Sequence, residues 1–360
     1  MLNRTLRQLA ALFILAAPLG AFADHHAGLN EEVTHHYADN NGVKIHYVKT
    51  GNGPLVVMIH GFPDYWYSWR HQIKPLTEAG FKVAAIDVRG YGGSDKPLDI
   101  ADYTLKNIAA DIAGVIDSLG YKEAFLFGHD WGGPIVWTTG LLYQDTIKAV
   151  GALSVPYTPV GEKSLIQLFR ELYKDKFFYQ LYIQEEGVAE AEFEADVRKA
   201  LEITYFSGDG RGMQFMLESI GNPAYQKTPD SKMLENSPRF DTYPNWLSQE
   251  DMNYFIKEFE QSGFRGPFNR YRAQDIDFEE LQEFKNMSYP LPACFITGTL
   301  DPVNFFARDE SASQEDILEA FTKNYDDLRK VEIIDGIGHW TQQESPELVT
   351  SHMIDFLTII

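Results

Sequence analysis

An aspartate in a glycine-rich turn is the residue in this sequence best placed to do chemistry. The motif GHDWGG, residues 128–133, follows an apolar run at 124–127 and precedes a helical pattern over 134–142. Gly128 and Gly132 would let a strand turn sharply into a helix, which places Asp130 exposed at the carboxyl edge of a sheet. An aspartate before a helix is also an ordinary N-cap, but the flanking glycines favour a nucleophile.

The residue type at this turn indicates the kind of reaction. A serine there attacks an acyl carbon and forms an ester that water can cleave. A carboxylate that displaces a leaving group from a saturated carbon also forms an ester, whereas a serine would form an ether that does not hydrolyse. The aspartate therefore predicts alkyl transfer.

Hydrolysis of such an ester needs a base that activates water and an acid that orients the base. His339 lies in GIGHW, residues 336–340, after an apolar run at 331–334, and we expect it to be the base. Asp301 follows the run at 292–297 and is the expected acid, although Asp301-Pro302 is also a common way to begin a turn. Asp335 remains the alternative acid, because no acid follows the run at 149–155.

The motif HGFP, residues 60–63, supplies a place for negative charge to develop. It follows the apolar run 55–59, so we expect the backbone N–H groups of Phe62 and Trp131 to bind the oxyanion of the hydrolytic step. The remaining residues expected to shape this loop and the substrate pocket are His60, Gly61, Pro63 and Trp340.

The elements that must position these residues alternate along the chain. Strand-like runs occur at 43–48, 55–59, 82–86, 124–127, 149–155, 292–297 and 331–334, mostly separated by helical patterns. This alternation predicts an α/β fold with a mostly parallel central sheet flanked by helices. Strand signals vanish between 159 and 289, where amphipathic stretches such as 185–206 predict an inserted helical cap, leaving 24–158 and 290–360 as the core.

Composition excludes several classes of protein. Among 360 residues, 44% are hydrophobic, which rules out intrinsic disorder as the default. The net charge of −21 repels phosphate backbones, so we expect no nucleic acid partner. The lone Cys294 excludes an internal disulfide.

We expect neither a cofactor nor a metal. The segment RGYGGS, residues 89–94, lacks the spacing and the lysine of a phosphate-binding loop, so we interpret it as a turn. The histidine pairs at 25–26 and 35–36 precede the first predicted strand, in a segment expected to be flexible, and are poor metal ligands for that reason.

The N-terminal residues 1–23 are typical of a secretory signal peptide. Arg4 and Arg7 precede an apolar stretch at 9–19, and Ala21-Phe22-Ala23 forms a small-x-small cleavage pattern. The stretch is too short to span a bilayer, which needs about 20 residues. We therefore expect cleavage after about Ala23, a periplasmic or secreted protein and no stable membrane anchor.

The motifs together resemble the epoxide hydrolase branch of the α/β-hydrolase family, such as the hydrolase domain of soluble epoxide hydrolase. The resemblance runs through HGFPDYWYSWR (60–70), DVRGYGGSDKP (87–97), GHDWGG (128–133) and GHWTQ (338–342). It extends to FFYQLYIQEEGVAEAE (177–192) and GFRGPFNRYR (263–272), which look like the cap segments of that branch. The resemblance implies an α/β-hydrolase fold with Tyr179 and Tyr271 over the nucleophile, both donating to an epoxide oxygen.

The resemblance implies that a lipophilic epoxide and water react to a vicinal diol, without a cofactor. The sequence departs from the commoner pattern at Arg270, where many relatives carry an aromatic residue, and at Glu186, where proline is frequent. One alternative is a haloalkane dehalogenase, but those enzymes typically carry asparagine where Phe62 stands. Another is a non-catalytic secreted protein with this fold, but it would be expected to lack an essential side chain.

Overall fold

An eight-stranded sheet forms the centre of the protein. The computed structural model describes residues 33–305, 319 and 322–360. The strand order is β1-β2-β4-β3-β5-β6-β7-β8. The strands are β1 (Thr34–Asn40), β2 (Val43–Gly51), β3 (Leu55–Ile59), β4 (Lys82–Ile86), β5 (Ala124–His129), β6 (Ile147–Leu153), β7 (Ala293–Gly298) and β8 (Leu328–Ile334).

Most of this sheet is parallel. β1 pairs with β2 and β2 with β4 in antiparallel register, whereas every pair from β4 through β8 is parallel. All five residues of β3 are buried, as are all six of β5. Continuous apolar runs form these central strands because helices cover both faces of a parallel sheet. The predicted α/β-hydrolase fold class is confirmed.

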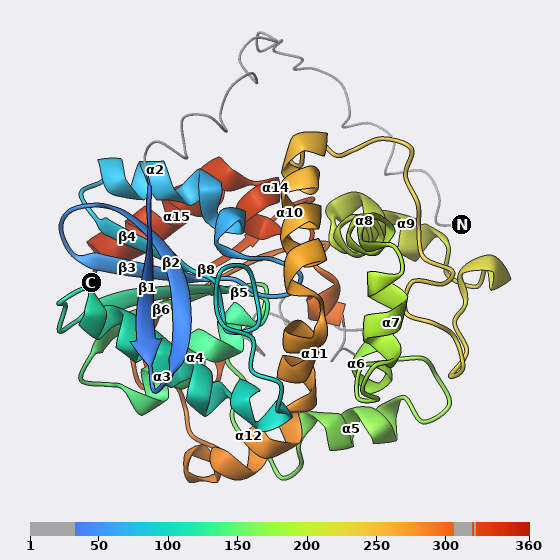
Figure 1. Cartoon of the computed structure of the whole chain (residues 1–360), viewed down its shortest axis with the longest axis horizontal. Helices are drawn as coiled ribbons and strands as arrows, with labels where there is room; N and C mark the ends of the chain where they lie inside the picture. Colours follow the sequence, from blue (N-terminus) through green and yellow to red (C-terminus); the bar gives the residue numbers. More distant parts are fainter. Residues whose placement is uncertain (1–32, 306–318, 320–321) are drawn as a thin grey trace, which may run out of the picture.

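Helices cover the sheet on both sides (Figure 1). α2 (Arg70–Glu78) and α15 (Pro346–Thr358) pack together on one face, and α3 (Leu105–Ser118) and α4 (Gly132–Leu142) pack together on the other. α14 (Thr341–Glu344) directly follows the loop that carries His339. The described chain also contains the short 3-10 helices η1 (Trp66–Trp69), η2 (Ile100–Tyr103), η3 (Pro223–Tyr225), η4 (Gln282–Phe284) and η5 (Pro302–Phe305).

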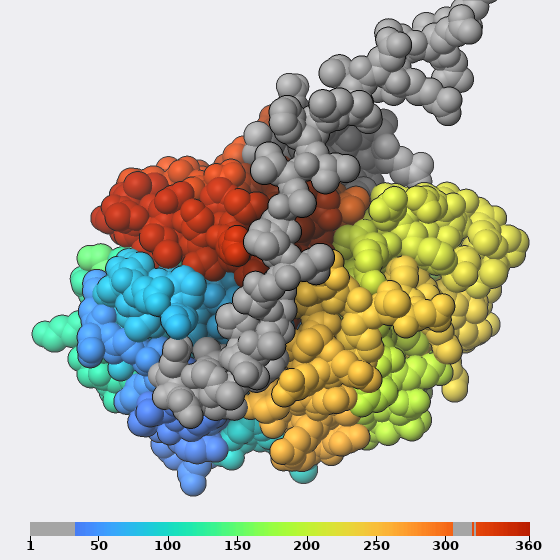
Figure 2. Space-filling model, turned by 90° about the horizontal axis from the view of Figure 1, so that it is seen from above, coloured from blue at the N-terminus to red at the C-terminus, as the bar shows by residue number. Residues whose placement is uncertain are grey.

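The chain between β6 and β7 forms a helical cap. Its helices are α5 (Leu165–Leu172), α6 (Tyr179–Tyr182), α7 (Val188–Glu194), α8 (Val197–Gly208), α9 (Gly210–Glu218), α10 (Gln249–Ser262), α11 (Arg265–Arg272) and α12 (Gln274–Glu280). Seen from above, the yellow and orange cap elements lie to one side of the blue and red core elements (Figure 2). The cap thus leaves the sheet after β6 and returns to it at the neighbouring strand β7.

One prediction from the sequence differs from this fold. His35 and His36 lie in β1, paired with β2, and not in a flexible segment. The amphipathic stretch 185–206 contributes to two helices: α7 ends at Glu194, and Asp196 caps α8 by accepting from the backbone N–H of Lys199. The predicted signal peptide, residues 1–23, and the pair His25-His26 lie outside the described residues.

Candidate active site

Asp130 lies in the sharp turn between β5 and α4. Its backbone φ is +53°, a left-handed conformation that side chains other than glycine adopt infrequently. The turn closes because glycines flank it: a Cβ on Gly128 would lie 2.0 Å from the carbonyl oxygen of Gly132, and one on Gly132 would lie 2.1 Å from that of Ile59. Close backbone packing, including packing against β3, therefore keeps Asp130 in this strained conformation.

The Asp130 carboxylate is largely covered, in contrast to the exposed position expected from the sequence. Its side chain is 15% exposed, because the cap lies over the carboxyl edge of the sheet. Burial by itself would raise the pKa of Asp130, but His339 and the backbone N–H of Phe62 outweigh it and lower that pKa. Asp130 is accordingly a carboxylate at neutral pH, which is the nucleophilic form.

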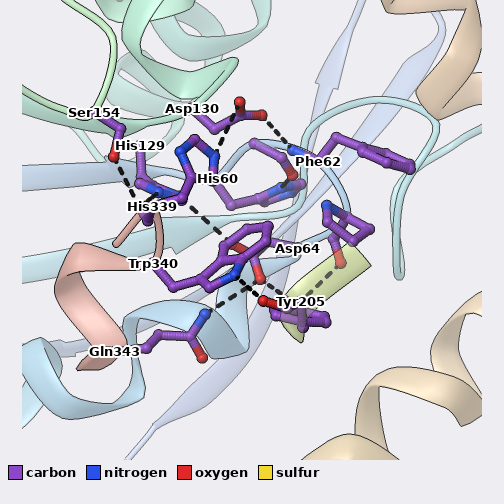
Figure 3. Close-up of polar contacts among 12 residues, drawn as sticks. His60, Phe62, Asp64, His129, Asp130, Ser154, Tyr205, His339, Trp340 and Gln343 are labelled. Atoms are coloured by element: carbon purple, nitrogen blue, oxygen red, sulfur yellow. Dashed lines mark hydrogen bonds and ion pairs between the residues drawn. The ribbon is translucent and has the colours of Figure 1, made fainter. Parts of the chain in front are cut away.

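His339 bridges two carboxylates. Its Nε2 lies 3.3 Å from Oδ2 of Asp130, and its Nδ1 lies 3.1 Å from Oδ1 of Asp301 (the Asp130 contact is drawn in Figure 3). Asp301 is buried and also accepts from the backbone N–H of Val303 at 3.0 Å. Asp335 is exposed and accepts instead from the Thr299 hydroxyl at 3.3 Å. The geometry therefore groups Asp130, His339 and Asp301, without Asp335.

The protonation of His339 follows from these two neighbours. Burial by itself would lower the pKa of His339, but the carboxylates of Asp301 and Asp130 raise it to about 10. The imidazole is consequently protonated at neutral pH in the resting protein. It can act as a base only after one of the two negative charges has been removed.

The loop of residues 60–63 contacts Asp130 directly. The backbone N–H of Phe62 donates to Oδ1 of Asp130 at 2.8 Å (Figure 3). A Cβ on Gly61 would lie 2.4 Å from that same oxygen and 2.6 Å from the backbone nitrogen of Trp131, so glycine is required there. Gly61 thus packs against both the Asp130 carboxylate and the Trp131 backbone nitrogen, and the Phe62 N–H already contacts an oxygen at which negative charge would develop.

Three further residues of the predicted site form hydrogen bonds around it, namely His60, Pro63 and Trp340. His60 accepts from the backbone N–H of Val88 at 3.0 Å through Nε2, so its Nδ1–H donates to the carbonyl of Gly61 at 2.8 Å. Burial lowers the pKa of His60, which keeps this ring neutral. The Pro63 carbonyl accepts from the Tyr205 hydroxyl, and the Trp340 indole N–H donates to the Tyr205 carbonyl at 2.7 Å.

Two cap tyrosines lie near the Asp130 carboxylate. Tyr179 is the first residue of α6 and Tyr271 lies in α11, and their ring centroids are 5.9 Å apart. Burial, with the negative charge of Asp130 next in order, raises the pKa of both phenols above the usual value. The Tyr271 ring also packs edge-on against the Trp131 indole, with centroids 5.1 Å apart. Both phenols therefore keep their protons at neutral pH and lie close enough to feel the nucleophile's charge.

Several supporting residues were not anticipated from the sequence. The His339 carbonyl accepts from Nε2 of His129 and from the Ser154 hydroxyl, both at 2.8 Å (Figure 3). Nδ1 of His129 in turn lies 3.6 Å from Oδ2 of the buried Asp64. His129 stands directly before Asp130, and Ser154 directly after β6, so both carry the signal of a polar residue at a strand end.

Arg270, the departure from the commoner family pattern, is fully buried against Trp131, the residue that follows Asp130. Its guanidinium lies over the Trp131 indole, 4.8 Å from the ring centroid, and pairs with Asp277. It also donates to the Tyr103 carbonyl. Burial lowers the pKa of Arg270 to about 9. The ion pair joins α11, which carries Tyr271, to α12, and the hydrogen bond to Tyr103 in η2 joins α11 to the core.

No group of three or more His, Cys, Asp or Glu side chains suited to a metal ion occurs among the described residues. Within the same residues, no helix is both long enough and apolar enough to cross a membrane.

Comparison with known proteins identifies the family. The alpha/beta hydrolase fold family matches residues 54–346. The chain belongs to the epoxide hydrolase branch of this family. It is 38% identical to "Epoxide hydrolase A" of Mycobacterium tuberculosis over 90% of this chain and 97% of the relative. It is 35% identical to "Epoxide hydrolase 2" of Siraitia grosvenorii over 91% of this chain and 99% of the relative.

Solved structures agree with this assignment. An epoxide hydrolase from an endophytic Streptomyces superimposes with a TM-score of 0.84 at 38% identity, covering 91% of this chain and 96% of that one. Epoxide hydrolase A from Mycobacterium thermoresistibile superimposes with a TM-score of 0.81 at 36% identity, covering 91% of this chain and 98% of that one.

Proposed function

We propose that this protein hydrolyses lipophilic epoxides to vicinal diols through an ester on Asp130. The observation that carries the proposal is the position of the Asp130 carboxylate. It lies between the Phe62 N–H and the His339 imidazole, and the Tyr179 and Tyr271 phenols are near enough for its charge to raise their pKa. The names of the relatives supply independent support for an epoxide as substrate.

In the first step, Oδ2 of Asp130 attacks a ring carbon of the epoxide. The carbon–oxygen bond of the ring breaks, and the departing oxygen takes a proton from Tyr179 or Tyr271. An alkoxide is far more basic than a phenolate, so a phenol can protonate it although burial raises the phenol pKa. The product of this step is a hydroxyalkyl ester of Asp130.

The ester changes the role of His339. Alkylation removes the negative charge of Asp130, one of the two charges that hold the His339 pKa near 10. The imidazolium then gives up its proton, which restores the phenol that was deprotonated in the first step, and the neutral ring, oriented by Asp301, accepts a proton from water. Hydroxide adds to the Asp130 carbonyl carbon, the Phe62 and Trp131 N–H groups bind the oxyanion, and collapse releases the diol and restores the carboxylate.

The surroundings of the site favour an apolar substrate. Phe62 packs against a cluster of cap aromatics, with ring centroids between 5.4 and 6.4 Å from those of Phe268, Tyr271, Phe193 and Phe264. Binding of apolar groups against these aromatic rings is favourable, whereas polar groups would find few hydrogen-bond partners there. We therefore expect aryl or alkyl epoxides without charge.

A haloalkane dehalogenase is the runner-up. It needs N–H donors for a departing halide, whereas the residue after Gly61 here is Phe62, whose side chain has no N–H. Measuring halide release beside epoxide consumption separates the two activities, and release of halide from haloalkanes without epoxide turnover would overturn the proposal.

Isotope labelling tests the covalent step. In one turnover of styrene oxide in H₂¹⁸O, the heavy oxygen should enter the Asp130 carboxylate, because water attacks the ester carbonyl. Label that appears in the diol alone would contradict an ester intermediate. His339→Gln should form the ester and fail to hydrolyse it, so the intact mass should rise by the mass of styrene oxide. Asp130→Asn is the matched control and should gain no mass.

We also propose that the protein is exported and loses residues 1–23. The sequence supports this through its basic, apolar and small-residue segments in order. The test is to recover the protein from the host's periplasm or medium and to determine its N-terminal residue by mass spectrometry. A mature protein that still begins at Met1 would contradict export by this route.

A further inference from the structure

A carboxylate behind the His339 loop is not used by the mechanism above. Glu344 is the last residue of α14, five positions after His339. Its Oε1 accepts from the backbone N–H of Trp340 at 3.0 Å. Its Oε2 accepts from the backbone N–H of Gly338 at 3.1 Å and from that of Gly210 at 3.0 Å. One side chain therefore binds the residues on both sides of His339 and, in addition, a residue of the cap.

The backbone at this point is packed too closely for other side chains. A Cβ on Gly338 would lie 2.4 Å from the backbone nitrogen of Gly210 and 2.6 Å from the carbonyl oxygen of Gly208. The His339 N–H donates to that same Gly208 carbonyl at 2.8 Å. The histidine loop and the α8–α9 junction of the cap are thus joined backbone to backbone, with the Glu344 carboxylate across the joint.

A carboxylate binds the three N–H donors at this joint more strongly than a neutral side chain would. Burial, with the charge of Asp209 adding to it, raises the pKa of Glu344 to about 7, and the three N–H donors act in the opposite direction. Charge-assisted hydrogen bonds to three backbone donors are stronger than those of a neutral side chain. A glutamine could keep an oxygen toward Gly210 and Gly338, but its NH₂ group would then face the Trp340 N–H, donor against donor.

We propose that Glu344 is a positioning residue for the hydrolytic step, holding the loop that carries His339 in register with the cap. The inference rests on the proposed function, because it assigns Glu344 to the half of that reaction in which His339 acts. Asp301 fixes the imidazole ring from Nδ1, His129 and Ser154 fix the His339 carbonyl, and Glu344 fixes the N–H groups on either side. Ester formation does not require His339 to accept a proton, so it depends less on the register of this loop than ester hydrolysis does.

The experiment separates the two half-reactions. Glu344→Gln, with enzyme in excess over styrene oxide, is followed by rapid quench and intact mass. We expect ester formation at close to the wild-type rate and an ester lifetime extended by about 10-fold, toward the roughly 100-fold that a 1 Å misplacement can cost. Glu347→Gln is the matched control, because Glu347 is exposed in the first turn of α15.

Two results would overturn the inference. One is an unchanged ester lifetime in folded Glu344→Gln. The other is an equal slowing of ester formation and ester hydrolysis together with a lower melting temperature, which would show a purely structural role. Glu344→Asp keeps the negative charge on a side chain that is one methylene shorter. Its ester lifetime should lie between those of Glu344→Gln and the wild type. This variant replaces Glu344→Gln if Glu344→Gln does not fold. Wild-type protein that forms no ester at all overturns the proposed function itself.

Discussion

Neutralising Asp130 should convert His339 from an acid into a base, and Asp130→Asn tests this directly. Asparagine suits the left-handed backbone at this position, and its oxygen can still accept from the Phe62 N–H. The charge it removes lies 3.3 Å from Nε2 of His339. At an effective dielectric constant of about 20, that pair is worth about 5 kcal/mol, equivalent to roughly three to four pH units.

We therefore expect the His339 pKa to fall from about 10 in the wild type to between roughly 6 and 7 in Asp130→Asn. The ring resonances of the ten histidines can be followed by NMR against pH, with His339→Gln identifying the signal of interest. Intact mass after the titration checks that the new amide has survived. If the midpoint in Asp130→Asn lay within one pH unit of the wild type, the Asp130 charge would not be what raises the His339 pKa.

Three further predictions concern the charges around the site. Asp301→Asn should slow ester hydrolysis by on the order of 10³- to 10⁴-fold in single-turnover assays, whereas Asp335→Asn should leave it unchanged; the reverse order would reassign the orienting acid. Because the folded pKa of His339 lies above its usual 6.5, its stabilisation is complete below pH 6.5 and is lost as pH rises toward about 10. The stability difference between wild type and His339→Gln in urea should therefore shrink across that window, and a constant difference would contradict the raised pKa. Arg270→Met should cost about 3–5 kcal/mol in the same measurement by leaving Asp277 buried and unpaired, and adding Asp277→Asn should recover much of the loss; no recovery would show that the ion pair is not the cause.

The turn at Asp130 could be predicted because its cause is local. A strand followed by glycines at 128, 132 and 133 has few ways to continue other than a tight turn into a helix. The choice between Asp301 and Asp335 could not be made, since each follows a parallel strand and both strands end at the same edge. Which carboxylate meets His339 depends on the path of the loops, and sequence spacing does not encode it.

Contacts between distant segments account for the rest. The coverage of Asp130 by the cap depends on how α6 and α11 pack, which begin 49 and 135 residues after it, so its low exposure was not foreseen. β1 was overlooked because its histidines suggested a polar tail, whereas pairing with β2 gives that segment its structure. Glu344 carries no local signal either, since its three partners include Gly210, 134 positions distant.

The backbone contact between the histidine loop and the cap restricts how this enzyme can be re-engineered. A chimera that takes its cap from a relative, in order to change selectivity, would ordinarily be joined where the cap leaves and re-enters the core, near β6 and β7. Here a donor cap must also bring a glycine at the place of Gly210, because a methyl group there would lie 2.6 Å from the carbonyl oxygen of Gly336. We expect grafts that lack this glycine to displace His339 even when every side chain of the proposed mechanism is retained.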